Sequence, residues 1–342
     1  MKKKEINFKD IGFNFVKTDT IFVSNYEKGK WDDGQFIPFQ KFEISPAACI
    51  FHYGQGIFEG LKAYRTKTGD ITLFRPEENA IRLNQSSERM LMPKYDTTKF
   101  IAAVKKVVKA NEEYIPPYET GGALYIRPLM IGTEPILGVA PANEYRFIIF
   151  TVPVAPYFKG GFETIDLKIT KTYSRTAPGG AGNAKTCCNY GPTLKPAKEA
   201  KKQGFNQVLY LDAVHKEYIE ETGAANFFAV INGRLVTPPL DDTILPGVTR
   251  KSVIQLAEKK LEVKVEERAI SYKELFEESC TEAFCTGTAA VITPIGSMVM
   301  GNEERTYTQR KPGELTTKLY DLLTGIQRLD VDDEFDWVMK VK

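Results

Sequence analysis

Residues 179–193, GGAGNAKTCCNYGPT, place one lysine, Lys185, among glycine, alanine and cysteine residues. Such neighbours are typical of a buried segment. Burial lowers the pKa of a lysine, so its free amine becomes a nucleophile able to form a Schiff base. The alternative is an ordinary loop lysine that reaches water, and local composition favours neither interpretation. This segment is therefore the first candidate for chemistry.

Four further features suit a ligand site. Tyr190 follows closely after the lysine, and Glu221 lies in the segment EETGAANFF. Residues 246–249, PGVT, open a predicted helix whose first N–H groups suit a phosphate, although most helix starts bind only water. Residues 286–290, TGTAA, let backbone approach a ligand closely. Each alone has an ordinary interpretation, such as a salt bridge for Glu221 and a turn for 286–290.

The amino-acid composition limits the kinds of catalytic site that the chain could contain. The chain has 342 residues, 46 Lys and Arg against 44 Asp and Glu, and two histidines, His52 and His215. A formal net charge of +2 indicates no bias towards nucleic acid or membranes. Two histidines exclude a His-rich metal site, and a Ser–His–Asp hydrolase would depend on one of them. We expect no metal and a catalyst that relies on lysine, tyrosine, carboxylates or an organic cofactor.

The cysteines indicate a reducing compartment. They are odd in number and form no C-x-x-C pair, and two adjacent ones bridge only with strain. The N-terminus lacks the apolar stretch of a secretion signal, and no window approaches a membrane span of about 18 apolar residues. We expect a cytoplasmic protein. The five cysteines are Cys49, Cys187, Cys188, Cys280 and Cys285.

Strand and helix signals alternate without a strict βαβ rhythm, so the sequence predicts an α+β protein. Its length favours two domains, because one compact core seldom spans so many residues. Pro and Gly cluster in VPVAPYFKGGF, which predicts a linker over residues 156–165 between domains 1–155 and 166–342. Asn232-Gly233 predicts a β-hairpin turn. Helices are expected over residues 76–92, 97–111 and 249–261 and near the C-terminus.

Seven motifs in order closely resemble fold-type IV pyridoxal-phosphate enzymes, specifically branched-chain amino-acid aminotransferases of class IV. The resemblance covers nearly the whole chain and implies a small α/β N-terminal domain and a larger C-terminal domain with a β-barrel-like core. The motifs are HYGQGIFEGLKAYR, FRPEENAIRL, LYIRPLMIG, GGAGNAKTCCNYGPT, EETGAANFF, LVTPP with ILPGVTR, and TGTAAVITPIG.

The resemblance assigns cofactor roles. Lys185 would form the Schiff base with pyridoxal 5'-phosphate and then shuttle a proton as a free amine. Glu221 would pair with the pyridine nitrogen, and Tyr190 would hydrogen-bond the phenolate oxygen. Without the motif, a solvated helix arginine would be the preferred interpretation of Arg82. The residues implied for the phosphate are Arg82, the backbone N–H groups of Val248 and Thr249, and the Thr288 hydroxyl.

The resemblance also implies a substrate site. Strand alternation places Tyr125 and Arg127 on one face, where the arginine would serve carboxylates. Backbone N–H groups of Ala289 and Ala290 would bind the α-carboxylate. An apolar wall, partly from a neighbouring subunit, would accept leucine, isoleucine and valine alike, since it discriminates by only about 1–3 kcal/mol per methylene. The wall residues are Phe15, Tyr53 and Phe58, for which core packing is the alternative. His52, beside Tyr53, would support this wall, and His215 has no assigned task.

Two departures from the family stand out. Cys187-Cys188 replace residues that are small, often Gly-Gly, in many relatives. They are interpreted as small buried residues, with reactive thiols as the alternative. The redox C-x-x-C of some animal enzymes is replaced by Ala290 and Thr293, so no such thiol switch is expected.

The expected function is transfer of an amino group between branched-chain L-amino acids and 2-oxoglutarate by a homodimer. One alternative keeps the cofactor and changes the reaction, as in a D-amino-acid aminotransferase or an aminodeoxychorismate lyase. Another is a non-catalytic protein that keeps the fold for binding, which the presence of Lys185, Tyr190, Glu221 and Arg82 argues against.

Overall fold

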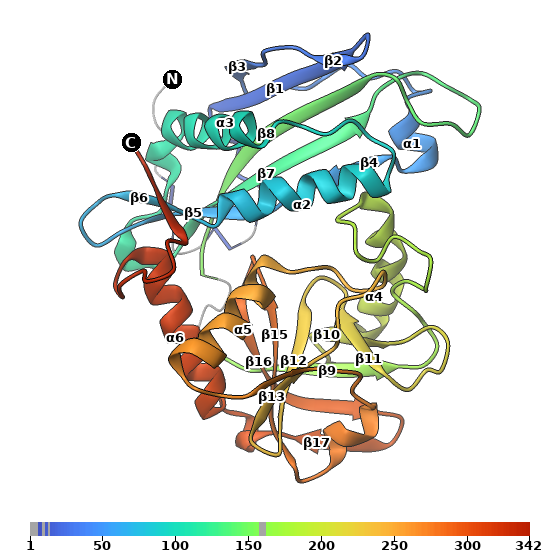
Figure 1. The fold of residues 1–342 in the computed structure, drawn as a ribbon, viewed down its shortest axis with the longest axis vertical. Helices are drawn as coiled ribbons and strands as arrows, with labels where there is room; N and C mark the ends of the chain where they lie inside the picture. Colours follow the sequence, from blue (N-terminus) through green and yellow to red (C-terminus); the bar gives the residue numbers. More distant parts are fainter. Residues whose placement is uncertain (1–5, 9–10, 13, 157–161) are drawn as a thin grey trace. The chain divides into compact units, whose positions relative to one another are not determined.

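The computed structural model describes residues 6–8, 11–12, 14–156 and 162–342 (Figure 1). By their internal contacts the residues form two units. The first unit comprises Met1–Lys159, Ala184–Cys187 and Gly325–Lys342, and the second comprises Gly160–Asn183 and Cys188–Thr324.

The first unit is built on an antiparallel sheet in the order β18-β6-β5-β7-β8-β1-β2, with β3 beside β1 and β4 beside β7. Its long central strands β7 and β8 are rich in branched and aromatic residues, whose side chains pack well on a pleated surface. The strands are β1 (Thr20–Glu27), β2 (Lys30–Trp31), β3 (Gln35–Pro38), β4 (Gly56–Phe58), β5 (Leu61–Arg65), β6 (Ile71–Phe74), β7 (Ala123–Gly132), β8 (Tyr145–Val154) and β18 (Val338–Val341).

Helices α2 (Pro76–Arg89) and α3 (Thr97–Ala110) lie on one face of this sheet (Figure 1). Pro76 begins α2 with two glutamates in the first turn, which suits the helix dipole. The Asp96 carboxylate caps α3 by accepting the Lys99 N–H at 2.8 Å. Apolar residues of both helices, such as Leu83 and Phe100, enter the core under the sheet. A short helix, α1 (Cys49–Tyr53), precedes β4.

The second unit contains a closed ring of strands in the order β11-β10-β9-β16-β15-β12, with β12 returning to β11. The barrel-like core and the α+β class are therefore confirmed. Strands β13 and β14 extend the ring from β12, and β17 pairs with β16. The strands are β9 (Ile165–Thr170), β10 (Gln207–Leu211), β11 (Ile219–Thr222), β12 (Asn226–Ile231), β13 (Arg234–Thr237), β14 (Val265–Glu267), β15 (Cys280–Gly287), β16 (Val291–Met300) and β17 (Glu303–Thr306).

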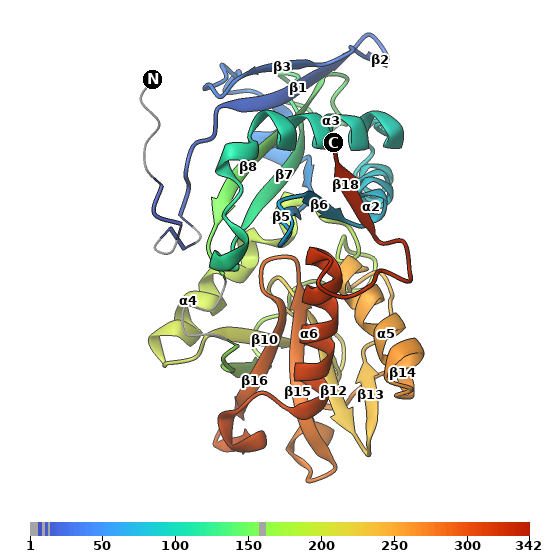
Figure 2. The same cartoon turned by 90° about the vertical axis from the view of Figure 1, so that its left-hand side faces the viewer.

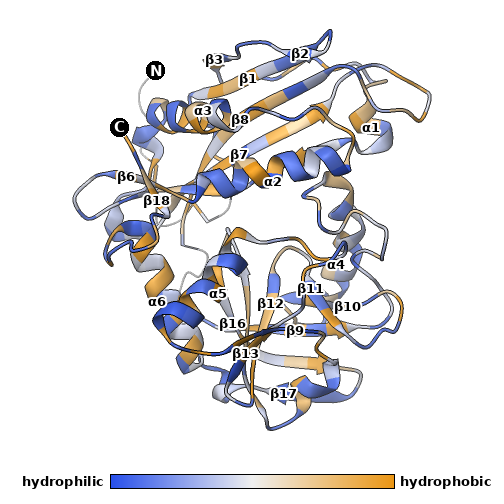
Figure 3. Cartoon of the chain, in the orientation of Figure 1, coloured by the Kyte–Doolittle hydropathy of each residue, from blue (hydrophilic) through white to orange (hydrophobic). Residues whose placement is uncertain are grey.

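The predicted turn at Asn232-Gly233 joins β12 to β13, and both residues have positive φ, as a tight hairpin requires. Helices α5 (Val248–Lys260) and α6 (Glu314–Arg328) run alongside the strands of this unit (Figure 2). Helix α6 carries both hydrophobic and hydrophilic residues (Figure 3). Its Leu319 and Leu323 are buried. This unit also contains α4 (Leu194–Lys202).

The units differ in extent from the domains predicted at 1–155 and 166–342. Strand β18 pairs with β6, so the last residues belong to the first unit, and residues 184–187 join it as well. Such long-range pairing leaves no local signal in the sequence. Of the linker predicted at 156–165, residues 157–161 lie outside the described residues. Over the described ranges, no helix has both the length and the apolar character needed to cross a membrane.

Candidate active site

Backbone hydrogen bonds fix the segment around Lys185, a half-buried residue, within the first unit. The Lys185 N–H donates to Ser86 Oγ of α2 at 2.9 Å, and its carbonyl accepts the Phe58 N–H at 3.0 Å. Thr186 forms an isolated bridge with β4 and donates its hydroxyl to the Gly56 carbonyl at 2.8 Å. The segment therefore adds to the edge of β4, which sets the direction in which the lysine side chain leaves the backbone.

Four predicted site residues meet on one side of this sheet. Lys185 Nζ lies 4.9 Å from the centre of the Phe58 ring, and the Arg127 guanidinium lies 4.7 Å from the same ring. Arg127 also donates to the Tyr125 hydroxyl at 3.1 Å, which confirms that these two side chains share a face. Arg127 Nε is buried and has no hydrogen-bond partner in the described part of the chain. The arrangement is an amine, an aromatic ring and a guanidinium with an unused donor.

Gly60 makes this arrangement sterically feasible. A Cβ at this position would lie 2.2 Å from the Tyr125 hydroxyl oxygen, far inside any contact distance. Glycine lets the chain between β4 and β5 pass close to the tyrosine hydroxyl, which accepts a hydrogen bond from Arg127.

Arg82 is buried, not solvated, so the alternative interpretation of a surface helix arginine is wrong. Its Nε and Nη2 donate to the two carboxylate oxygens of Glu59, both at 2.8 Å, and Asn79 adds a third bond to that carboxylate. Burial alone would raise the pKa of Glu59. The charges of Arg82 and Lys185 and the hydrogen bonds outweigh this effect, so the pKa is lowered. Glu59 thus holds the guanidinium in place as a fixed cation.

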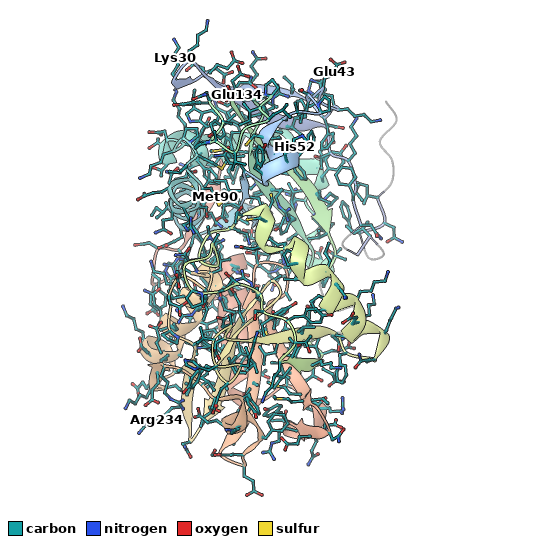
Figure 4. All side chains as sticks on the ribbon, turned by 90° about the vertical axis from the view of Figure 1, so that its right-hand side faces the viewer. Lys30, Glu43, His52, Met90, Glu134 and Arg234 are labelled. Carbon is teal, nitrogen blue, oxygen red and sulfur yellow. The ribbon has the colours of Figure 1, made fainter. Side chains whose placement is uncertain are left out.

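The other predicted residues of this unit lie in more open positions. Phe15 is 63% exposed and its ring lies 5.7 Å from that of Phe39. Tyr53 is half-buried and donates to the Leu137 carbonyl. His52 is exposed on α1 and bonds the Pro46 carbonyl at 2.8 Å (Figure 4). The substrate-wall role of Phe15 and Tyr53 stays a prediction.

The two adjacent cysteines after Thr186 differ in burial. Cys187 is half-buried and Cys188 is exposed, in the short helix Cys187–Asn189. The interpretation of this pair as small buried residues is therefore wrong for Cys188. The boundary between the two units lies between Cys187 and Cys188.

In the second unit, Glu221 on β11 is a buried carboxylate with three fixed donors. Arg175 pairs with Oε1 at 2.8 Å, the Leu245 N–H donates to Oε1 at 3.1 Å, and Asn226 Nδ2 donates to Oε2 at 3.1 Å. Cation and amide donors stabilise the ionised form of a buried carboxylate. Glu221 is therefore suited to hold a cationic ring nitrogen.

Arg175 and Glu59 were missed by sequence reasoning. Glu59 lies inside the motif HYGQGIFEGLKAYR, which could have drawn attention to it. Arg175 lies in an irregular segment distant in sequence from Glu221 and has no local signal. Only the tertiary fold pairs each charge with its partner.

The start of α5 offers backbone donors for an anion. Its N-cap is Gly247, no side chain caps it, and its first turn holds no acidic residue. A Cβ at Gly247 would lie 2.0 Å from Asn226 Oδ1, so glycine is required for this close approach. By helix geometry the N–H groups of Val248 and Thr249 have no partner within the helix. Such a terminus suits a phosphate dianion.

The predicted turn of Thr288, Ala289 and Ala290 joins β15 to β16. Val291 closes the turn with φ of +63°, a strained value for a β-branched residue. Just before the turn, the Thr286 hydroxyl is buried and has no hydrogen-bond partner among the described residues. Strained backbone and an unsatisfied hydroxyl are features that cluster at ligand sites. Tyr190, half-buried before the short helix Gly191–Thr193, completes the predicted set in this unit.

These donor sets fit pyridoxal phosphate chemically. Within the second unit, a helix start suited to an anion, a buried carboxylate and an unsatisfied hydroxyl match its phosphate and its ring. Within the first unit, a lysine amine beside an aromatic ring matches its aldehyde. In the described part of the chain, no cluster of three or more His, Cys, Asp or Glu residues is arranged for a metal ion.

Comparisons with known proteins agree with this chemistry. Residues 56–298 match the family of class IV amino-transferases. A branched-chain-amino-acid aminotransferase 2 of Bacillus subtilis is 43% identical over 345 residues, covering 99% of this chain and 94% of that protein. The crystal structure of the Escherichia coli branched-chain amino acid aminotransferase has a TM-score of 0.81 and 27% identity, over 95% of this chain and all of that one.

A second solved structure is that of the branched-chain aminotransferase from the thermophilic archaeon Thermoproteus uzoniensis with norvaline. It has a TM-score of 0.78 and 26% identity, over 95% of this chain and all of that one. The family match, the sequence identity over nearly the whole chain and the fold all point to the same group of enzymes. The chain therefore belongs to the class IV aminotransferases, within the branched-chain-amino-acid aminotransferase group.

Proposed function

We propose that this protein is a pyridoxal-phosphate-dependent transaminase that exchanges the amino group between branched-chain L-amino acids and 2-oxoglutarate. Family membership supports the reaction class. The observation that carries the proposal is the position of Lys185, hydrogen-bonded between α2 and β4 with its amine above the Phe58 ring.

Pyridoxal phosphate supplies, when bound, an aldehyde carbon that takes up amino groups and a ring that accepts electrons from the reacting carbon. We assign the aldehyde to Lys185, the ring nitrogen to Glu221 and the phenolate oxygen to Tyr190. Arg82, the N–H groups of Val248 and Thr249, and the Thr288 hydroxyl are assigned to the phosphate. Lys185 Nζ would accept the proton from the substrate α-carbon and return it.

We assign substrate recognition to two kinds of contact, polar groups that bind carboxylates and an apolar wall that contacts the side chain. Arg127, with its unused buried Nε, suits a carboxylate, and the Tyr125 hydroxyl is oriented beside it. We assign the α-carboxylate to the N–H groups of Ala289 and Ala290. Phe15, Tyr53 and Phe58 would form the apolar wall, which accepts leucine, isoleucine and valine because methylene groups are weakly discriminated.

Two further assignments concern the cell and the assembly. All five cysteines lie in the described part of the chain and none forms a disulfide, which supports a reducing compartment, and we propose the cytoplasm. We also propose a homodimer, supported by large apolar side chains at the surface of the first unit, among them Leu137 and Val139, 83% and 88% exposed.

Lys185→Ala tests the function. We expect the purified variant, saturated with pyridoxal phosphate, to lose the visible absorption of the bound cofactor. Turnover of L-leucine with 2-oxoglutarate should fall by about 10²–10⁴-fold or more, because the proton carrier is lost. Steady-state assays with L-leucine, L-isoleucine, L-valine, D-alanine and aminodeoxychorismate identify the reaction.

The matched control is Lys195→Ala, which removes a lysine whose side chain is 73% exposed. This variant should keep both the visible absorption of the bound cofactor and the turnover of L-leucine. Absence of L-leucine turnover by the wild-type protein would refute the proposed function. Turnover of D-alanine or aminodeoxychorismate instead would favour the corresponding alternative.

A further inference from the structure

Asn226, the first residue of β12, is a buried polar residue to which the proposed function assigns no task. Its exposed fraction is 4%. It pairs directly with Glu221 of β11 and with Thr286 of β15, both in antiparallel register. Residues that pair directly in this way share a face of the sheet. Asn226 therefore lies between the carboxylate assigned to the ring nitrogen and the Thr286 hydroxyl, which is buried without a hydrogen-bond partner in the described part of the chain.

Three hydrogen bonds join Asn226, Glu221 and Leu245 in a closed ring. Asn226 Nδ2 donates to Glu221 Oε2 at 3.1 Å and to the Leu245 carbonyl at 2.8 Å. The Leu245 N–H donates in turn to Glu221 Oε1 at 3.1 Å. A carboxylate oxygen and a carbonyl oxygen both need a donor, so the nitrogen of the amide faces them and its oxygen faces away. The ring therefore fixes the Glu221 carboxylate relative to the backbone at Leu245.

The oxygen of the same amide packs against the start of α5. A Cβ on Gly247, the N-cap of this helix, would lie 2.0 Å from Asn226 Oδ1 and 3.2 Å from Asn226 Cγ. Gly247 has φ of −69° and ψ of 131°, which other residues adopt readily, so glycine is needed here for space. Pro246, between Leu245 and Gly247, restricts rotation of the chain. One side chain thus contacts both Glu221 and the helix start.

These two contacts concern opposite ends of one ligand. In the proposed function, Glu221 binds the ring nitrogen and the start of α5 binds the phosphate, and both groups are attached to one ring. A protein that binds both ends must hold its own two groups at a matching separation. Binding costs less conformational entropy when the groups are already in place.

We propose that Asn226 is a positioning residue that fixes the Glu221 carboxylate relative to the N–H groups at the start of α5, so that both ends of the cofactor meet groups already in place. This inference rests on the proposed function. Arg175 pairs with Oε1 of the same carboxylate at 2.8 Å and supplies charge, whereas Asn226 supplies the connection to α5.

Asn226→Ala removes both N–H donors and the contact with Gly247 without adding a charge. The cofactor-free full-length chain is titrated with pyridoxamine phosphate, with pyridoxamine, which lacks the phosphate, and with inorganic phosphate, which lacks the ring. Isothermal titration measures the first ligand, and competition against it measures the other two. We expect the affinity for pyridoxamine phosphate to fall by about tenfold or more, because a hydrogen bond to a charged group is lost.

The comparison between the three ligands isolates the positioning role. A fixed separation benefits only a ligand that spans both groups, so the fold loss for pyridoxamine phosphate should exceed the product of the fold losses for pyridoxamine and inorganic phosphate. An effect on Glu221 alone would weaken pyridoxamine and pyridoxamine phosphate by the same factor. Asn302→Ala, in the exposed turn between β16 and β17, is the matched control and should bind all three ligands like the wild type.

Thermal melting of the cofactor-free chain tests the contact with α5 independently of any ligand. Gly247→Ala places a methyl group against Asn226 Oδ1 and should lower the melting temperature by several degrees. In the Asn226→Ala background this space is open, so the same substitution should lower the melting temperature much less. The methyl group would lie 3.2 Å from Arg250 Cβ in either background, so the difference between the two reports on Asn226.

Each measurement can contradict the proposal. A loss of affinity for pyridoxamine phosphate no larger than the product for the two fragments would overturn the positioning role. Equal effects of Gly247→Ala in the two backgrounds would overturn the contact with α5. Failure of the wild type to bind pyridoxamine phosphate would overturn the proposed function, while the melting cycle would still decide whether Asn226 holds the helix start. Asn226→Ser provides the same comparisons if Asn226→Ala does not fold.

Discussion

Glu59 determines the state of Arg82, the residue assigned to the cofactor phosphate. The carboxylate is fully buried, and its two oxygens accept both guanidinium bonds at 2.8 Å. The donors of a guanidinium lie in one plane, so two bonds to the same carboxylate fix the orientation of that plane. The single buried carboxylate of Glu59 therefore both orients the Arg82 guanidinium and balances its charge.

Glu59→Gln should destabilise the fold by about 3–5 kcal/mol, because Arg82 remains buried as an uncompensated cation. The lowered pKa of Glu59 means that its stabilisation is present above its unfolded pKa and is lost as the pH falls through the folded value. The variant should therefore lose less stability between neutral pH and acid than the wild type. Urea unfolding at pH 7 and in acid measures both effects.

Glu88→Gln is the matched control on the same helix, because Glu88 forms an exposed ion pair with Lys94. Exposed pairs contribute little to stability, so no measurable change is expected. Equal unfolding free energies for Glu59→Gln and Glu88→Gln would contradict the structural role of the buried pair.

The first residues of helix α6 donate hydrogen bonds to a carboxylate on a strand that precedes the helix by about 30 residues in the sequence. Glu282 of β15 accepts the Leu315 N–H at 3.1 Å, the Thr316 N–H at 3.0 Å and the Thr316 hydroxyl at 2.7 Å. The first N–H groups of a helix have no partner within it, and here a strand side chain provides one. At the scale of an element, this contact fixes where α6 begins.

Glu282→Ala should cost about 1–3 kcal/mol, since buried N–H groups at the start of α6 are left without an acceptor. Chemical unfolding followed by circular dichroism measures the loss. Thr281→Ala, at the neighbouring exposed position of the same strand, should have little effect. A change for Thr281→Ala as large as that for Glu282→Ala would argue against the capping role.

At the scale of the whole molecule, apolar side chains gather at one end of the first unit. Phe51 of α1 and Leu137 and Val139 of the loop between β7 and β8 are 61%, 83% and 88% exposed. Backbone hydrogen bonds hold this loop beside α1, since the Ile136 N–H donates to the Ala47 carbonyl at 3.0 Å. Large exposed apolar residues on adjacent segments are typical of a protein interface.

The double variant Leu137→Lys, Val139→Lys should therefore shift the proposed homodimer towards monomer, which light scattering after size-exclusion chromatography measures. Lysines at an apolar interface lose burial energy and add repulsion between like charges. Val214→Lys, at a 65% exposed position of the second unit, is the control and should remain dimeric. Unchanged dimerisation in the double variant would exclude this surface as the interface.

Much of the fold and part of the site could be predicted from local sequence. The hairpin at Asn232-Gly233, the helix beginning at Pro76 and the shared face of Tyr125 and Arg127 depend on residues near one another in the chain, so backbone preferences and strand alternation suffice. The motif around Lys185 indicated the fold family for the same reason.

Only the tertiary structure decided the partners of the buried charges and the closure of the second sheet. Arg175 meets Glu221, Glu59 meets Arg82, and β12 returns to β11 to close a ring of strands. None of these charge pairs has a local signature, because desolvation and charge pairing depend on what the whole chain brings together. The sequence by itself determined which residues could react, and the fold determined their charge, orientation and exposure to water.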